Sequence, residues 1–276
     1  MRWRDDAPHM RLRPPVAALA LVVLSAASPA QALDPFEIQV YDGTANAPHV
    51  VGLELHMNRV ATGYSASVAP ELPLHGQTHL TLEPSFGLFP WWELGAYLQT
   101  SLGSDGRYAY AGTKLRSKFV TSPTFHPHLR LGLNIELSVL PRAYDRDRFA
   151  AELRPIAAWH GEGWLVAVNP IIGVGLAGQH GHEGPTFEPC AKVARSVAEV
   201  LAFGVEYYGS VGPIASPSPP PQQIHQFFGV VDIEALHEVE IELGLGGGVT
   251  PASAGLIGKI VLGYTVDLGK LAARAR

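Results

Sequence analysis

Apolar and polar residues alternate at every second position, segment after segment, from residue 51 to residue 268. In the segment VGLELHMNRV, for example, Leu53 and Leu55 alternate with Glu54 and His56. Because successive side chains of a β-strand point to opposite faces, this pattern predicts strands with one apolar and one polar face. About a dozen such segments in succession predict a closed sheet with one apolar wall and one polar wall.

The alternating segments predict twelve strands, most of them long enough to cross a bilayer when tilted. Their expected ranges are 51–59, 77–86, 92–101, 108–120, 128–140, 150–160, 164–173, 187–195, 200–208, 226–236, 238–246 and 257–268. Bacterial single-chain outer-membrane barrels have an even number of strands. The sequence therefore predicts an all-β fold, a transmembrane antiparallel up-and-down β-barrel of about twelve strands whose apolar wall faces lipid.

The first 32 residues have the features of a secretory signal peptide. Arg11 and Arg13 precede the apolar run VAALALVVLSAA, which is too short to span a bilayer, and the small-x-small site AQA ends at Ala32. We therefore expect cleavage near Ala32 and a location in the bacterial outer membrane. The expected organisation is a signal peptide (1–32), a periplasmic N-terminal arm (33–50) that folds beneath or into the barrel, the barrel (51–268) and a periplasmic C-terminal tail (269–276).

Charge and cysteine content exclude several classes of protein. The chain has 20 basic and 25 acidic residues, and the signal segment holds four Arg and two Asp, which leaves a net charge of about −7. This balance does not favour a nucleic-acid partner. One cysteine, Cys190, excludes an internal disulfide. No apolar run of helix-spanning length follows the signal segment, so a membrane location requires a closed barrel without open sheet edges.

The connections between the expected strands differ in length in an ordered way. After odd-numbered strands most are long, and after even-numbered strands most are short, with segments 102–107 and 121–127 as departures. Outer-membrane barrels alternate long outer loops with short periplasmic turns in this manner. Aromatic residues such as Phe89, Trp91 and Trp92 cluster near strand ends, which is typical of an interfacial girdle, although the same rings could fill the core of a soluble barrel.

The polar wall is the expected location of function. A dry protein core could not hold so many charged side chains, so water or a network of ion pairs must fill this interior. Basic residues lie on the fourth to sixth strands, and acidic residues lie on the tenth and eleventh and again on the first to third. The predicted lumen-lining residues are Lys114, Arg116, Lys118, Arg130 and Arg154 (basic) and Glu54, Glu83, Glu93, Asp232, Glu234, Glu240 and Glu242 (acidic). Two interpretations stay open: a transverse field that selects solutes by charge, or a structural network that plugs the lumen.

Three histidine motifs are candidates for chemistry. His180 and His182 lie in the loop sequence GQHGHEGPT with Glu183, but no second group of ligands accompanies them, so we predict no metal site. The sequence FHPH is interpreted as a structural turn. His79-Leu80-Thr81 resembles the histidine–hydroxyl pairing of outer-membrane phospholipases, but both polar side chains are expected to point inward and no serine is present. We therefore predict no enzyme and no cofactor.

Several segments together resemble a known group of barrels. Glu188-Pro189, Lys192 and the sequence GVEYYG at 204–209 match a recurring strand–turn–strand pattern, and the last hairpin ends in a glycine-rich run. Between residues 76 and 268 the chain resembles the proteobacterial outer-membrane barrels of the MetA-pathway phenol-degradation family. The resemblance implies uptake of small, often aromatic or hydrophobic, compounds. The chain departs from such barrels by continuing past Leu268 into GKLAARAR instead of ending on an aromatic residue.

These observations predict an outer-membrane channel or transporter that passes small solutes through a charged lumen. The expected partners are outer-membrane lipid, the barrel-assembly machinery during biogenesis and a small-molecule solute. Three alternatives remain open: a soluble periplasmic binding barrel, a plugged structural barrel, and a lipid-modifying outer-membrane enzyme.

Overall fold

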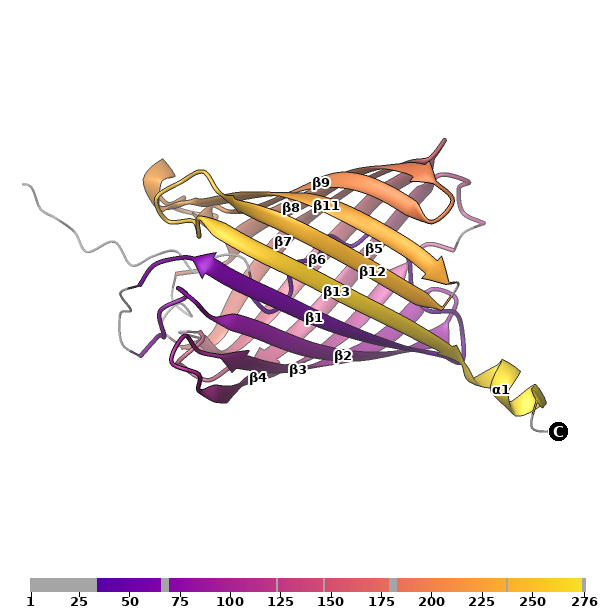
Figure 1. Ribbon diagram of the computed structural model, residues 1–276, viewed down its shortest axis with the longest axis horizontal. Helices are drawn as coiled ribbons and strands as arrows, with labels where there is room; N and C mark the ends of the chain where they lie inside the picture. Colours follow the sequence, from indigo (N-terminus) through magenta and orange to yellow (C-terminus); the bar gives the residue numbers. More distant parts are fainter. Residues whose placement is uncertain are drawn as a thin grey trace, which may run out of the picture.

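The alternating segments form the strands of a closed antiparallel barrel (Figure 1). The computed structural model describes residues 34–65, 70–122, 124–145, 147–178, 183–236 and 238–274. Each of the twelve long strands pairs with its neighbours along the chain, and the last long strand pairs with the first, which closes the sheet. The prediction of a twelve-stranded up-and-down barrel is therefore confirmed. The expected signal peptide lies outside the described residues.

The strands extend beyond most of the ranges expected from the sequence. They are β1 (Val50–Thr62), β2 (Thr78–Phe89), β3 (Trp92–Leu102), β4 (Tyr108–Val120), β5 (Leu129–Val139), β6 (Asp147–Gly161), β7 (Trp164–Gly178), β8 (Thr186–Ala198), β9 (Leu201–Ser210), β10 (Gly212–Pro213), β11 (Ile224–Leu236), β12 (Val239–Gly248) and β13 (Leu256–Asp267). The two-residue β10 pairs with β8 beside the main ladder. The alternation identified the central part of each strand, but ladder pairing continues past it into segments such as VGLAG at the end of β7.

The two ends of the barrel differ. At one end, the turn end, β6 and β7 are joined by the two residues Glu162 and Gly163, both at positive φ as a tight hairpin requires. At the opposite end, the loop end, longer segments such as 63–77 and 211–223 connect the strands. The C-terminal helix α1 (Leu268–Arg274) follows β13 at the turn end (Figure 1). No helix in the described part of the chain is long and apolar enough to cross a membrane.

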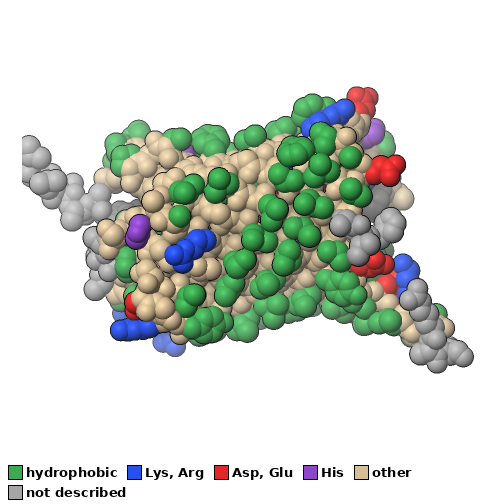
Figure 2. Space-filling model, in the orientation of Figure 1, with side chains coloured by type: hydrophobic (Ala, Val, Ile, Leu, Met, Phe, Trp, Pro, Cys, Tyr) green, Lys and Arg blue, Asp and Glu red, His purple; other side chains and the backbone are tan. Residues whose placement is uncertain are grey.

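The outer wall of the barrel is apolar. Met57, Leu98 and Leu137 are 36%, 48% and 55% exposed, and each is flanked on its strand by buried side chains with polar groups. Figure 2 shows apolar side chains over much of one side of the barrel, most densely toward the turn end. Phe89, Trp91, Trp92 and Phe119 stack on one another at the turn end. The rings therefore lie at a rim of the apolar wall, as in an interfacial girdle.

The segment before β1 lies inside the barrel. Residues 34–49, the arm, begin near the loop end and run through the interior to the start of β1 at the turn end. Phe36, Ile38, Val40 and Tyr41 of the arm are at most 7% exposed although no strand contains them. Ile38 and Val40 belong to a buried apolar cluster with wall residues such as Ile257. Of the two placements that the sequence left open, beneath or into the barrel, the structure has the second.

Candidate functional site

A clamp from β7 holds the middle of the arm. The side chain of Asn169, which is fully buried, accepts a hydrogen bond from the backbone N–H of Tyr41 at 2.7 Å and donates one to its carbonyl at 2.9 Å. The hydroxyl groups of Tyr41 and Tyr97 lie 2.7 Å apart. These contacts satisfy backbone groups that would otherwise be unpaired in the barrel interior.

Other wall residues bind the backbone of the arm nearer to the loop end. Thr81 donates to the carbonyl of Phe36 at 2.9 Å, and Lys259 donates to the carbonyl of Ile38 at 3.0 Å. Asn58 holds the carbonyl of the preceding Pro35 in the same way, at 2.9 Å. The inner faces of β1, β2 and β13 thus recognise the arm through its main chain.

Charged residues of the arm complete the wall's ion pairs. Asp34 lies 2.5 Å from the ammonium group of Lys114, and Glu37 lies between Lys114 (3.6 Å) and the guanidinium of Arg154 (3.1 Å). Glu37 is 2% exposed. Without the arm, two buried cations of the wall would lose acidic partners, so the arm is part of the charge balance of the lumen.

The basic residues of β4 pair with acids on nearby strands. Arg116 lies 2.5 Å from Glu83 on β2 and 2.6 Å from Glu93 on β3. Lys118 also contacts Glu93, at 3.0 Å. The positive charges predicted on this wall therefore contact nearby acids instead of facing an acidic wall across an open bore.

A second network occupies the opposite side of the barrel. Lys192 contacts Asp232 at 2.8 Å, Glu242 at 2.6 Å and Glu206 at 3.4 Å. The fully buried Lys259 lies 2.5 Å from Glu242 and forms a short ion pair with Glu206. Asp232 and Glu242 were predicted from the sequence to line the lumen, but their pairing with lysines was not.

The remaining predicted lining residues lie near the turn end. Arg130 is half-buried and donates to the carbonyl of His126 at 2.7 Å. Glu234 and Glu240 are exposed, because they lie within a few residues of the turn that joins β11 to β12. Glu234 and Glu240 line the cavity at this end of the barrel and not its buried centre.

Glu54, His56 and Glu83 converge on the inner face of β1 and β2, a grouping that was not predicted from the sequence. The imidazole Nε2 of His56 lies 3.4 Å from Glu54 and 3.3 Å from Glu83, and ligand atoms of the three residues fall within 4.8 Å of one another. Such a group could hold a metal ion, but Arg116 already pairs with Glu83. The arrangement fits an imidazole ion-paired with carboxylates. The only signal in the sequence was their shared polar face, since the Glu54–Glu83 register is not readable from it.

The three histidine motifs of the sequence differ in where the structure places them. His180 and His182 lie outside the described residues. His126 and His128 lie near the ring of Trp159 at the turn end, and His128 contacts the carbonyl of His160 at 2.8 Å. His79 and Thr81 are at most 1% exposed and point into the barrel, away from the apolar wall.

The arm divides the interior into two spaces. A pocket at the loop end, the loop-end pocket, has a volume of about 60 Å³ and contains Phe36 and Ile38 of the arm in its wall. A larger cavity, the turn-end vestibule, has a volume of about 720 Å³ and contacts the arm at Gln39 and Tyr41. Between them the arm occupies the bore.

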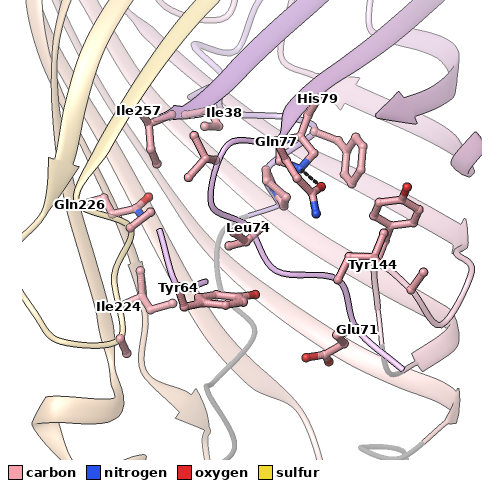
Figure 3. A pocket seen from close by; sticks show the side chains of 17 residues that line it. Ile38, Tyr64, Glu71, Leu74, Gln77, His79, Tyr144, Ile224, Gln226 and Ile257 are labelled. Carbon is pink, nitrogen blue, oxygen red and sulfur yellow. Dashed lines mark hydrogen bonds between the residues drawn. The ribbon is translucent and has the colours of Figure 1, made fainter. Parts of the chain in front are cut away.

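The loop-end pocket has an apolar and aromatic lining with a few polar groups (Figure 3). The rings of Phe36 and His79 lie edge to face at a centroid distance of 4.6 Å. Gln77 lies 3.1 Å from the Nε2 of His79. The side-chain oxygen of Gln226 is buried in the pocket wall and has no hydrogen-bond partner among the described residues. Its volume of about 60 Å³ is far below the roughly 300–1,000 Å³ of usual ligand pockets, so a ligand with a ring fits here only when the arm or the loop-end residues shift.

Acidic residues dominate the turn-end vestibule. Lys118 and Lys192 are among its few basic residues, and both are ion-paired. Its acidic lining residues are Asp42, Glu54, Glu83, Glu93, Asp232, Glu234, Glu238, Glu240 and Glu242. This entrance therefore favours cations over anions.

Comparison with known structures places the fold among outer-membrane β-barrels. The chain is similar to the COG4313 outer membrane channel from Pseudomonas putida F1, with a TM-score of 0.55, 12% identity and coverage of 83% of this chain and 100% of that chain. It is also similar to a KdgM porin (0.51, 7%, 77% and 98%) and to the NanC porin (0.51, 6%, 79% and 98%). At these identities the likeness establishes the architecture.

Comparison by sequence yields no relative. No family model matches the chain, and no curated protein matches it. The resemblance to the phenol-degradation family is therefore not confirmed and stays a prediction.

Proposed function

We propose that this protein is an outer-membrane channel for small solutes, closed in the described conformation by its own arm. The single observation that carries the proposal is a pair of cavities at opposite ends of one barrel, separated by a segment that is not part of the wall. Hydrogen bonds and ion pairs hold the described part of the arm in the bore, and its covalent link to the wall there is the peptide bond to Val50 at the start of β1. A structural barrel could fill its lumen with wall side chains alone and would need no such segment.

The loop-end pocket supports small aromatic compounds as the solute. Rings of Phe36 and Tyr64 offer stacking surfaces, and the unpartnered oxygen of Gln226 accepts a hydrogen bond from a phenolic hydroxyl. The acidic vestibule behind the arm favours solutes without negative charge. A compound with an aromatic ring, a hydroxyl group and no anionic group suits both the loop-end pocket and the turn-end vestibule.

Uptake into proteoliposomes tests this proposal. We would compare 3-hydroxyphenyltrimethylammonium with tetramethylammonium, two permanent cations that do not cross lipid unaided. The aromatic cation should enter at least five times faster although it is larger. Ile224→Trp, which fills the loop-end pocket, should abolish that preference, and Val249→Trp, at an exposed loop-end site, should not. Equal rates for the two cations would reject aromatic selection, and no uptake of either cation, with or without residues 34–46, would reject the channel.

The second candidate function is a plugged structural barrel. The observation in its favour is the density of buried ion pairs around the arm. A barrel of this kind would show no uptake in the same proteoliposomes, with or without the arm.

A further inference from the structure

The apolar wall contains a hollow where side chains are missing. This outer groove, with a volume of about 590 Å³, crosses β11, β12, β13 and β1, and its lining includes Met57, Arg59, Thr78, Gly229, Leu245 and Gly258. A Cβ atom added at Gly229 or Gly258 would meet nothing within 4 Å. These two positions therefore form an open floor in a wall that is elsewhere covered by leucine and valine.

A cation stands at one end of the groove. Arg59 is exposed and shares the outward face of β1 with Leu53, Leu55 and Met57. Four residues form a row across the sheet from β1 to β11. Arg59 pairs with Gly258, Gly258 pairs with Leu245, and Leu245 pairs with Gly229. Figure 2 shows a basic side chain on this face, in an area with few apolar side chains.

The guanidinium of Arg59 is available to an anion. It donates one hydrogen bond, to the hydroxyl of Thr78 at 2.9 Å. No acidic side chain of the described residues forms an ion pair with it. A guanidinium has five N–H donors arranged to bind phosphate or carboxylate in a bidentate manner. On a wall that faces lipid, the anion that can reach it is a lipid headgroup.

The position of Arg59 selects the leaflet. It lies three residues before the end of β1 at the loop end, or roughly 10 Å along the strand. Outer-membrane barrels direct their long loops to the cell exterior. Arg59 then lies near the headgroups of the outer leaflet, where charge on the lipid face is tolerated best.

We propose that the outer groove binds a phosphorylated, multiply acylated lipid of the outer leaflet, lipid A. Its phosphate binds Arg59 and Thr78, and an acyl chain lies over Gly258 and Gly229. Charge complementarity favours this occupant. The groove has a cation at one end of an apolar surface, and lipid A has phosphate groups next to its acyl chains. The inference does not depend on whether the bore conducts.

Native mass spectrometry of the full-length mature barrel with added lipid A tests the proposal. Arg59→Gln and Gly258→Leu should each lower the lipid-bound fraction about tenfold, and Arg59→Lys should lower it less. Arg195→Gln is the matched control, since Arg195 is exposed at the turn end, over the ring of Trp164. It should change binding less than twofold. Heat-modifiable migration on gels verifies that each variant is folded.

Two further arms identify the source of the phosphate. The wild-type barrel should have a low lipid-bound fraction with dephosphorylated lipid A. That fraction should be no higher than the fraction of the Arg59→Gln variant that binds intact lipid A. Inorganic phosphate at the same concentration should not displace lipid A. Equal binding by wild type and Arg59→Gln, an equal loss in Arg195→Gln, or displacement by inorganic phosphate would each overturn the proposal.

Discussion

Loosening the arm should expose Cys190, the only cysteine of the chain. The thiol is 4% exposed, lies 3.6 Å from the side-chain oxygen of Asn169, and belongs to the buried cluster that contains Ile38 and Val40. A water-soluble maleimide can therefore reach it only when the arm moves. Its labelling rate reports the fraction of barrels with an undocked arm.

Asn169→Leu removes both hydrogen bonds of the clamp on Tyr41. A buried neutral hydrogen bond contributes about 1 kcal/mol net, so docking should weaken by about 2 kcal/mol. Because about 1.4 kcal/mol corresponds to a factor of ten, the undocked fraction and the labelling rate should rise roughly 30-fold.

Thr81→Val is a second variant that does not contact Cys190. It removes one hydrogen bond, to the carbonyl of Phe36, so the labelling rate should rise roughly five-fold. Ser138→Ala serves as the control, because its hydroxyl bonds to the wall carbonyl of Ala150 and not to the arm. Deleting residues 34–46 gives the upper limit of the rate. The reasoning is refuted if both variants label at the wild-type rate while the deletion labels fast.

Two further predictions concern the wall. Lys259→Met should destabilise the barrel by about 3–5 kcal/mol, because it leaves the buried carboxylate of Glu206 without one of its cations. Urea unfolding in detergent should show this loss of stability. The control Lys270→Met, in the exposed C-terminal helix, should leave the stability unchanged. Leu98→Arg, at mid-strand, should cost about 2–4 kcal/mol in lipid, whereas Leu102→Arg, at the loop-end terminus of the same strand, should cost about 0–1 kcal/mol. Equal costs at the two positions would contradict a lipid-facing wall, and unfolding in bilayers measures both.

The fold could be predicted because its signal is local. Alternation with period two identifies the faces of a strand wherever it pairs, so the polar wall and the strand number followed from the sequence alone. Strand ends were less accurate, since ladder pairing at the loop end extends past the alternating part. The apolar run at the end of β7 shows this, because it continues the strand to Gly178 without alternating.

The site could not be predicted to the same depth, because its contacts join distant parts of the chain. Lys259 binds the carbonyl of Ile38 across 221 positions of sequence, and Asn169 binds Tyr41 across 128. No sequence pattern records such pairs. The apolar side chains of the arm pack inside the barrel, and wall side chains such as Asn169 bind the backbone of its middle part. The ion pairs likewise depend on strand register.

Planar-bilayer conductance of two forms of the protein tests the central claim most directly. The claim is that the arm closes a bore which the wall alone would leave open. The mature chain should remain closed with rare openings, the chain lacking residues 34–46 should give stable open channels, and Asn169→Leu should open more often than the wild type. Equal conductance with and without the arm, or no current from either form at any voltage, would contradict the account.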